Sequence, residues 1–135
     1  MSKSIKFLMI YKWLNEMGVK NYSINVDLTV DVEGSVNIGS KNLDEIPIQF
    51  GVVTREFSCI HNNITSLKGC PRKVGDGFYC YDNAIKSLEG CPEYVGKIFS
   101  LCSRDVFYPA KLIRGKIFKK KDIKRICCVG NLIYE

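Results

Sequence analysis

The sequence has 135 residues, 46% of them apolar and 25% charged, with a formal net charge of +6. This length fits one domain with a single core, and the composition is typical of soluble globular proteins and excludes a disordered or membrane-spanning chain. The apolar run "IKFLMIYKWL" contains Lys6 and Lys12 and is followed by no small-residue cleavage site, so we expect no export, no membrane partner and a cytoplasmic location.

The amino-terminal segment "SIKFLMIYKWLNEMG" predicts a helix over residues 4–17 that ends before Gly18. Its apolar residues recur at mixed three- and four-residue steps: Ile5, Leu8, Met9, Leu14 and Met17. The next segment "INVDLTVDV", residues 24–32, alternates apolar and polar side chains, which predicts a strand. We therefore expect residues 1–34 to form a helix-and-strand cap at one end of the fold.

A repeat of 21 residues fills the middle of the chain. The string S-L-x-G-C-P-x-x-V-G begins at Ser66 and again at Ser87, and the same offset aligns phenylalanines, cysteines and asparagines. These matched residues are Phe57, Phe78 and Phe99, Cys59 and Cys80, and Asn62 and Asn83. Upstream, the shift continues in weaker form through Val36, Ile38 and Leu43. Two strong repeats between two degenerate ones are typical of a short solenoid, whose end units face water on one side.

Each repeat has the pattern F-x-C-x-x-N-x-I-x-S-L and resembles the leucine-rich pattern L-x-L-x-x-N-x-L-x-x-L, whose period is about 20–29 residues. The sequence thus predicts an α/β repeat fold, a short leucine-rich-repeat-like solenoid of about four coils with one parallel sheet. Its coils occupy residues 35–102, and its neighbouring parallel strands are residues 36–38, 57–59, 78–80 and 99–101. The repeated asparagine is expected to bond the turn that leaves each strand. Gly-Cys-Pro is expected to form a corner of each coil.

The carboxyl-terminal residues 103–135 predict a basic cap. "KKDIKRICCV" places Ile123, Ile126 and Cys127 on one helical face, and "NLIYE" is typical of a final edge strand. The chain is therefore expected to be a single domain, residues 1–135, in which a helix and a strand close each end of the solenoid.

Four stretches of the sequence together resemble a family of small tailed-bacteriophage proteins of unassigned function. They are "MGVKNYSIN", "VDVEGSVNIGSKNLDEIPIQFGVV", the Gly-Cys-Pro repeats and "KKKDIKRICCVGNLIYE". Residues 102–118 depart from the family's pattern, in which an Asn-Pro turn leads directly into the last helix. The resemblance implies a protein that works in the cytoplasm of a bacterial host and that blocks or redirects a host process such as antiphage defence.

The sequence favours neither catalysis nor metal binding. Cys59, Cys70, Cys80 and Cys91 lack the C-x-x-C spacing of a compact zinc site, and we interpret them as small apolar core residues. His61 is the only histidine, and the chain contains no phosphate-loop glycine motif. We therefore expect a protein that is not an enzyme, with no metal, no cofactor and no small-molecule substrate.

The outward side of the predicted strands is the main candidate site. Because alternate strand residues face opposite ways, its central positions are aromatic, apolar and almost uncharged. The candidate binding residues are Ser58, Ile60, Tyr79, Tyr81, Ile98 and Ser100. Tyrosine is enriched at protein interfaces, so the sequence predicts that this face binds a host or phage protein.

A basic segment gives an alternative function. Residues 111–125 contain eight basic residues and one acidic residue, whereas the rest of the chain holds 12 basic and 13 acidic residues. Such a cluster can follow a phosphate backbone, or it can simply keep the protein soluble. The candidate nucleic-acid contacts are Lys116, Lys119, Lys120, Lys121, Lys124 and Arg125.

If this segment binds nucleic acid, changing Lys119, Lys120 and Lys121 together to Gln should weaken binding and flatten its salt dependence. Each phosphate contact contributes about one log unit of binding constant per log unit of salt, so the slope should fall by about three. Fluorescence anisotropy with a labelled duplex over a salt series measures this slope. An unchanged affinity and slope would assign the three lysines to solubility alone.

Overall fold

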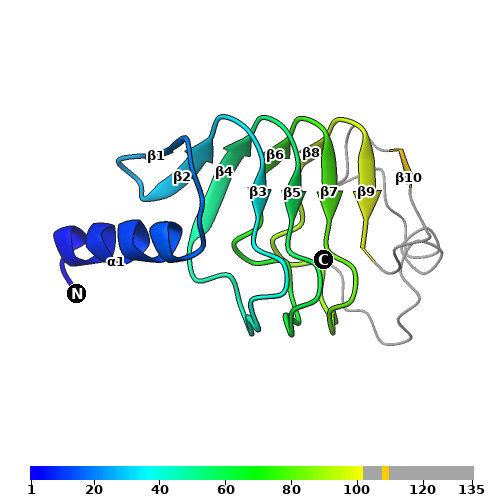
Figure 1. The fold of residues 1–135 in the computed structure, drawn as a ribbon, viewed down its shortest axis with the longest axis horizontal. Coiled ribbons are helices and arrows are strands. Elements are labelled where there is room, and N and C mark those ends of the chain that lie inside the picture. Colours follow the sequence, from blue (N-terminus) through cyan, green and yellow to red (C-terminus); the bar gives the residue numbers. More distant parts are fainter. Residues whose placement is uncertain (102–107, 110–135) are drawn as a thin grey trace.

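The computed structural model describes residues 1–101 and 108–109. The described chain begins with a helix and then coils into stacked turns of short strands (Figure 1). The solenoid predicted from the repeat is therefore confirmed. The predicted carboxyl-terminal cap lies outside the described residues, apart from the short strand β10 at Tyr108–Pro109.

Helix α1 spans Lys3–Glu16, which confirms the helix predicted near the amino end. The Ser2 hydroxyl accepts a hydrogen bond from the Ile5 N–H at 3.2 Å and caps the first turn. Gly18 ends the helix in a left-handed conformation, with φ at +76°. Leu14 is the buried residue of the helix. Three further side chains on the same side pack against the core: Ile10, Trp13 and Met17.

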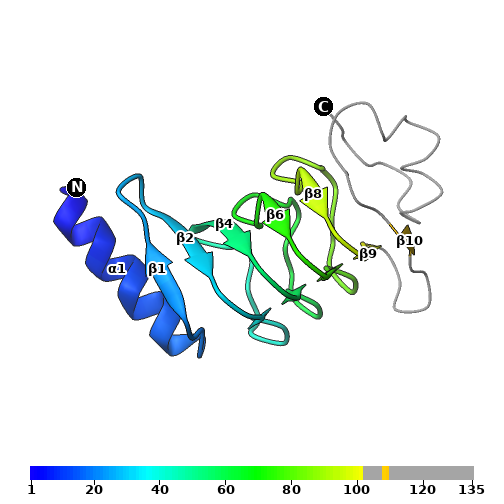
Figure 2. The same cartoon turned by 90° about the horizontal axis from the view of Figure 1, so that it is seen from above.

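A β-hairpin follows α1 and lies beside it (Figure 2). Its antiparallel strands are β1, Tyr22–Ile24, and β2, Thr29–Val32. The prediction of one strand over residues 24–32 is wrong, because two polar side chains close a turn inside that stretch. The Leu28 N–H donates to the Asn25 carbonyl at 2.8 Å, and the Thr29 hydroxyl donates to the Asp27 carboxylate at 2.6 Å. The alternating pattern therefore belongs to two strands with a tight turn between them.

Two sheets run along the solenoid. The first has the order β1-β2-β4-β6-β8, with β4 at Gln49–Val53, β6 at Lys73–Val74 and β8 at Tyr94–Val95. The second has the order β10-β9-β7-β5-β3, with β3 at Val36–Asn37, β5 at Phe57–Ser58, β7 at Gly77–Tyr79 and β9 at Ile98–Ser100. Strands β1 and β10 join their sheets antiparallel, and the other pairs are parallel.

The second sheet contains the strands that the sequence predicted. β3, β5, β7 and β9 are parallel neighbours in the expected order, with Phe57 opposite Val36. The expectation of one parallel sheet is wrong, because the chain extends again after each Gly-Cys-Pro corner. In this second extended segment, Val74 of β6 pairs in register with Val53 of β4 on one side and with Val95 of β8 on the other. Each coil therefore contributes a strand to both sheets.

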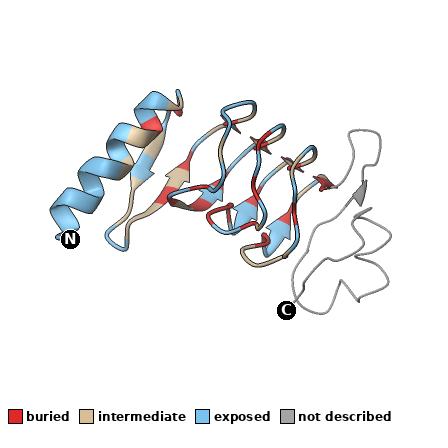
Figure 3. Cartoon of the chain, turned by 90° about the horizontal axis from the view of Figure 1, so that it is seen from below, coloured by how far each residue is buried: buried red, intermediate tan, exposed pale blue. Residues whose placement is uncertain are grey.

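A column of phenylalanine rings fills the core between the sheets. Phe50, Phe57, Phe78 and Phe99 are at most 1% exposed. The ring centroids of Phe57 and Phe78 are 5.8 Å apart, and those of Phe78 and Phe99 are 5.4 Å apart, with the rings stacked. Figure 3 shows buried residues recurring along the successive coils. Stacking of equivalent rings makes each coil dependent on its neighbours.

Two asparagines join neighbouring coils through their side chains. The Asn62 amide donates to the Cys59 carbonyl of its own coil and to the Ile38 carbonyl of the coil before, both at 3.0 Å. The Asn83 amide repeats these bonds with the carbonyls of Cys80, at 3.3 Å, and Cys59, at 3.0 Å. The prediction that the repeated asparagine bonds the turn after each strand is therefore confirmed.

The Gly-Cys-Pro strings form the predicted corners. Gly69 and Gly90 have φ angles of +88° and +86°, a region that favours glycine. A Cβ atom at Gly90 would also collide with the Leu67 carbonyl of the preceding coil. Glycine is thus required both by the backbone angle and by the close approach of neighbouring coils.

The cysteines of the repeats lie inside the coils as free thiols. Cys59, Cys70, Cys80 and Cys91 are buried, and the Sγ atoms of Cys59 and Cys80 are 2.8 Å apart. Burial raises the pKa of the Cys59 and Cys70 thiols well above its ordinary value, and the neighbouring thiols add to the effect at Cys59. Over residues 1–101 and 108–109, no group of three or more His, Cys, Asp or Glu residues could hold a metal ion. The buried positions of the four cysteines fit the role of small apolar core residues.

We expect a thiol reagent to label Cys59 and Cys80 slowly in the native protein and completely after unfolding, because both thiols are buried. Mass spectrometry of peptides from timed maleimide reactions measures both rates. A Lys68→Cys variant supplies a matched exposed thiol, since Lys68 is exposed on the same coils. Equal labelling rates at Cys59 and at the introduced cysteine in the native protein would contradict the prediction.

Candidate functional site

The candidate site is the outer side of β5, β7 and β9, which we call the strand face. The strands are in register, so Ser58 and Ser100 lie opposite Tyr79 on either side. Beyond the strand ends the stacking continues, because the His61 N–H donates to the Tyr81 carbonyl at 3.2 Å. Adjacent strands lie about 4.8 Å apart, so the side chains of three coils form one continuous surface.

The structure brings together most of the predicted binding residues. Five of the six are partly exposed on this surface: Ser58, Ile60, Tyr79, Tyr81 and Ile98. Ser100 is the exception, because it is 0% exposed despite its register with Tyr79. The prediction that Ser100 belongs to the accessible surface is therefore wrong. Strand alternation gives the side of the sheet on which a residue lies, and it does not show what covers that side.

The outer end of the Tyr79 ring lies over Gly77 of the same strand. A Cβ atom built at Gly77 would be 2.5 Å from both Cε2 and Oη of the Tyr79 ring. Gly77 has no side chain, and its backbone is buried. The absence of a side chain at Gly77 therefore creates the space in which the tyrosine ring rests, and this contact fixes the ring at the centre of the strand face.

The surroundings of Tyr79 are also electrostatically distinct. Partial burial raises the pKa of the Tyr79 phenol above its ordinary value, and the negative charge of Glu56 and the neighbouring Tyr81 and Asp76 add to this effect. The hydroxyl is thus held in its neutral form, in which it can both donate and accept a hydrogen bond. Asp76 is itself 3.3 Å from the Lys97 ammonium.

A polar cluster borders the strand face at the turn after each strand. His61 Nδ1 lies 2.9 Å from Asp82 Oδ2, and the His61 ring meets the Tyr81 ring edge-on with centroids 6.2 Å apart. Ser40, His61 and Asp82 occupy the same position in three successive coils, with φ angles of +55°, +54° and +55°. Analysis of the sequence missed this alignment, although the repeat offset places the three residues in one column.

A Ser, His and Asp column invites comparison with a catalytic triad, but the backbone accounts for these residue types. Short polar residues, Asn, Asp and His among them, are enriched at left-handed φ angles. His61 and Asp82 have side chains that are 40% and 47% exposed, so the pair is open to water rather than enclosed as in a hydrolase site. The expectation that the protein is not an enzyme stays a prediction.

The other sheet offers a contrasting surface. Its outward positions include Val52 and Tyr94, which are 40% and 39% exposed, and Lys73 lies between them in register. The charged Lys73 interrupts the apolar surface there, whereas the strand face has no charged residue between Ser58, Tyr79 and Ile98. The candidate basic contacts, Lys116 to Arg125, lie outside the described residues, and nucleic-acid binding stays a prediction.

Replacing Gly77 by Ala should move the Tyr79 ring away from its strand, because the new Cβ atom would collide with the ring. The ring can rotate away from this collision, whereas the backbone cannot. We expect the Tyr79 pKa to fall toward its ordinary value and stability to change by less than about 1 kcal/mol. Absorbance titration of the phenolate and thermal denaturation measure the two quantities. Since the folded-state pKa is raised, this phenol stabilises the fold below its unfolded pKa, and the contribution is lost as the pH rises through the folded value.

Gly75→Ala is the control for this prediction. A Cβ atom there would collide with the Thr54 carbonyl of the preceding coil, which is backbone and cannot rotate away. We expect this variant to lose about 1–3 kcal/mol of stability. If Gly77→Ala left the Tyr79 titration unchanged, the ring would not lie over Gly77.

No family model, no curated protein and no solved structure matches the chain. The resemblance to small tailed-bacteriophage repeat proteins stays a prediction, and the geometry of the strand face is the basis for assigning a function.

Proposed function

We propose that the protein is a non-enzymatic binding module that holds another protein against its strand face. The observation that carries this proposal is the pair Tyr79 and Tyr81, two partly exposed aromatic side chains on one side of the most regular coil. The surface that these two side chains form extends onto the neighbouring coils, where Ser58, Ile60 and Ile98 are partly exposed. The centre of the surface is uncharged and partly apolar, which suits a protein partner of complementary shape.

The arrangement of charge supports a protein interface. Two polar pairs lie at the border of the strand face rather than at its centre: the Lys97–Asp76 ion pair at 3.3 Å, and the His61–Asp82 contact at 2.9 Å. Protein interfaces commonly have such a polar rim around a core depleted in charge and rich in tyrosine. Tyrosine also brings a large contact area with few rotatable bonds, so little conformational entropy is lost on binding.

The partner in this proposal is a host or phage protein in the cytoplasm of a bacterial host. This part of the proposal rests on the resemblance of the sequence to small tailed-bacteriophage proteins. Binding would block or redirect a host process such as antiphage defence. Nucleic-acid binding through residues 111–125 is the second candidate, and the concentration of positive charge in that segment supports it.

We expect the double variant Tyr79→Ala/Tyr81→Ala to weaken partner binding by about 2 kcal/mol or more, because truncating central aromatic anchors has this effect. Its thermal stability should stay within about 1 kcal/mol of the parent, since both side chains point away from the core. Calorimetric titration against a partner captured from host lysate and then purified measures the first quantity. The capture is performed with and without nuclease, because a complex that depends on nucleic acid would favour the second candidate.

Two control variants make this experiment specific. Tyr94→Ala removes an exposed tyrosine from the other sheet and should leave the affinity unchanged. Phe78→Ala removes a buried ring and should destabilise the fold by about 3–5 kcal/mol. If the double tyrosine variant bound at full strength, the strand face would not be the binding site.

A further inference from the structure

The buried thiols of Cys59 and Cys80 form a pair that the strand face does not use. The two residues occupy the same position in neighbouring repeats, and their Sγ atoms are 2.8 Å apart. The sulfur atoms of a disulfide are about 2.05 Å apart. A closing movement of less than about 1 Å therefore separates this contact from a covalent bond.

The backbone holds these two cysteines side by side. The Cys59 N–H donates to the Tyr79 carbonyl at 2.9 Å. The next bond of the same ladder joins the His61 N–H to the Tyr81 carbonyl at 3.2 Å. The parallel pairing of β5 with β7 thus continues in register through Cys59 and Cys80. Neighbouring strands lie about 4.8 Å apart, and the Cα atoms of a disulfide are about 4.4–6.8 Å apart, so the main chains already have a suitable separation.

No buried polar group beside the pair would lose its hydrogen bonds on oxidation. The Cys59 thiol lies 3.7 Å from the Tyr79 carbonyl, which also accepts the Cys59 N–H. The Asn83 amide lies 3.8 Å from Cys80 Sγ and donates to the carbonyls of Cys59 and Cys80. These backbone bonds remain when the thiol hydrogens are lost, so a disulfide leaves neither group unsatisfied.

Cys70 and Cys91 are the competing thiols. They are also buried and also one repeat apart, at the Gly-Cys-Pro corners. The N–H groups of Cys70 and Cys91 bond the carbonyls of Leu67 and Leu88 within their own coils, at 3.0 and 2.9 Å. The inter-coil backbone bond at Cys59 thus has no counterpart at the N–H groups of the corner cysteines. The continuous ladder and the close sulfur contact together favour Cys59 and Cys80 as the reactive pair.

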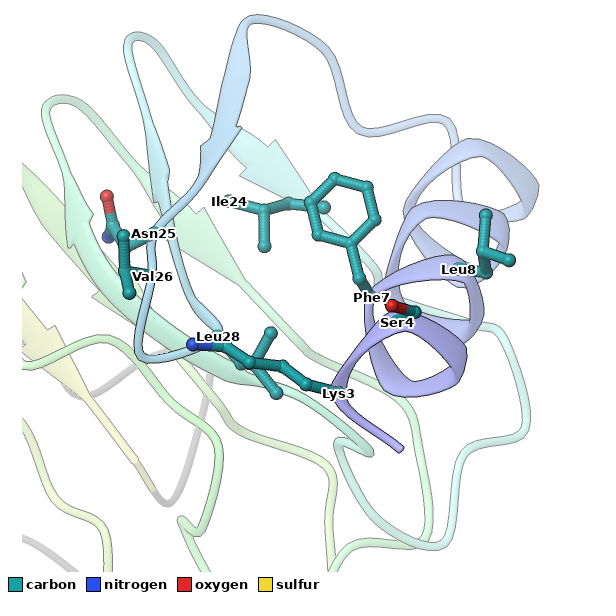
Figure 4. A pocket seen from close by; sticks show the side chains of 8 residues that line it. All are labelled: Lys3, Ser4, Phe7, Leu8, Ile24, Asn25, Val26 and Leu28. Carbon is teal, nitrogen blue, oxygen red and sulfur yellow. The ribbon is translucent and has the colours of Figure 1, made fainter. Parts of the chain in front are cut away.

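The closed fold keeps an oxidant away from this pair. Both side chains are 0% exposed. A groove of about 590 Å³ lies between α1 and the hairpin and is lined by residues between Lys3 and Leu28 (Figure 4). Two other hollows are lined by residues between Asn21 and Arg55. None of these three is lined by a cysteine, so the reaction proceeds through local opening of the coils.

We infer that Cys59 and Cys80 are a redox modification site, which a low-molecular-weight disulfide such as oxidised glutathione converts to a disulfide across two coils. In the opened protein, the thiolate of one cysteine attacks oxidised glutathione, which forms a mixed disulfide and releases one glutathione thiolate. As the coils close, the second cysteine attacks the protein sulfur of the mixed disulfide and releases the second glutathione. The two protein thiols lose two protons and two electrons, which leave in two molecules of reduced glutathione.

The fold and the disulfide favour each other by the same factor. A disulfide that closes the loop from Cys59 to Cys80 restricts the unfolded chain, which favours the folded state roughly a hundredfold for a loop of this length. By linkage, folding favours formation of the disulfide by that same factor. The pair stays reduced where reduced glutathione is in large excess, and a shift toward oxidised glutathione locks the two coils together.

Equilibration of the full-length protein in glutathione redox buffers tests this inference. Unfolded protein is diluted either into native buffer or into urea, so burial does not limit the reaction. We expect the equilibrium constant for the Cys59–Cys80 disulfide to be about a hundredfold larger in native buffer. Trypsin separates the four cysteines of the repeats into different peptides, residues 56–68, 69–72, 74–86 and 87–97. Mass spectrometry without reduction therefore identifies the bond as a link between the first and third of these peptides.

Two variants serve as controls. Cys59→Ala removes the pair and keeps the corner thiols, whereas Cys70→Ala keeps the pair. Oxidation should raise the melting temperature of the parent and of Cys70→Ala by about 5–10 °C, and it should not raise that of Cys59→Ala. Thermal denaturation in reducing buffer checks that each variant is folded, and the peptide map of the parent needs no variant.

An equilibrium constant in native buffer that is equal to the value in urea, or below it, would overturn the inference, because the fold would then oppose the bond. A native disulfide that joins Cys70 to Cys91, in place of the expected link, would also overturn it.

Discussion

The structure depends on one constraint, which is that the strands of neighbouring coils are paired in register at equivalent positions of the repeat. This register lets the side-chain amides of Asn62 and Asn83 each bond carbonyls of two coils at once. A buried amide that lost one of these partners would leave a polar group unpaired, at a cost of about 1–3 kcal/mol. The same register stacks Phe57 on Phe78 and brings the carbonyl of one coil against a glycine of the next. Polar and apolar contacts therefore specify the same spacing.

The sequence predicted most where identical residues repeat. The repeated Phe, Cys and Asn residues predicted β5 and β7, and the repeated Gly-Cys-Pro strings predicted the corners. The structure confirms both. The first sheet was missed because Val74 and Val95 are single apolar residues after a proline corner, with no alternation to mark a strand. The hairpin was missed because a period of two runs unbroken through its turn. In the first sheet, each strand pairs with a strand one repeat away in the sequence, so a local pattern could not show the pairing.

Prediction of the candidate site was more limited. Alternation correctly placed Tyr79 and Tyr81 on an accessible side. It could not show that Ser100 is covered, because burial depends on what packs above the strand. It also could not show that the Tyr79 ring rests on Gly77. The column of Ser40, His61 and Asp82 shares a backbone angle and not a residue type, so a search for identical residues passed over it.

The two regular coils each supply their own means of attachment: an asparagine for the coil before, a corner glycine that admits the neighbouring backbone, and a phenylalanine for the stack. A unit that carries all three parts can be copied within a gene without disturbing those on either side. Each added copy would widen the strand face by about 4.8 Å and leave the helix and hairpin at the amino end unchanged. The reach of the surface can thus grow in equal steps, so that partners of different size could be accommodated by counting coils rather than by redesigning them.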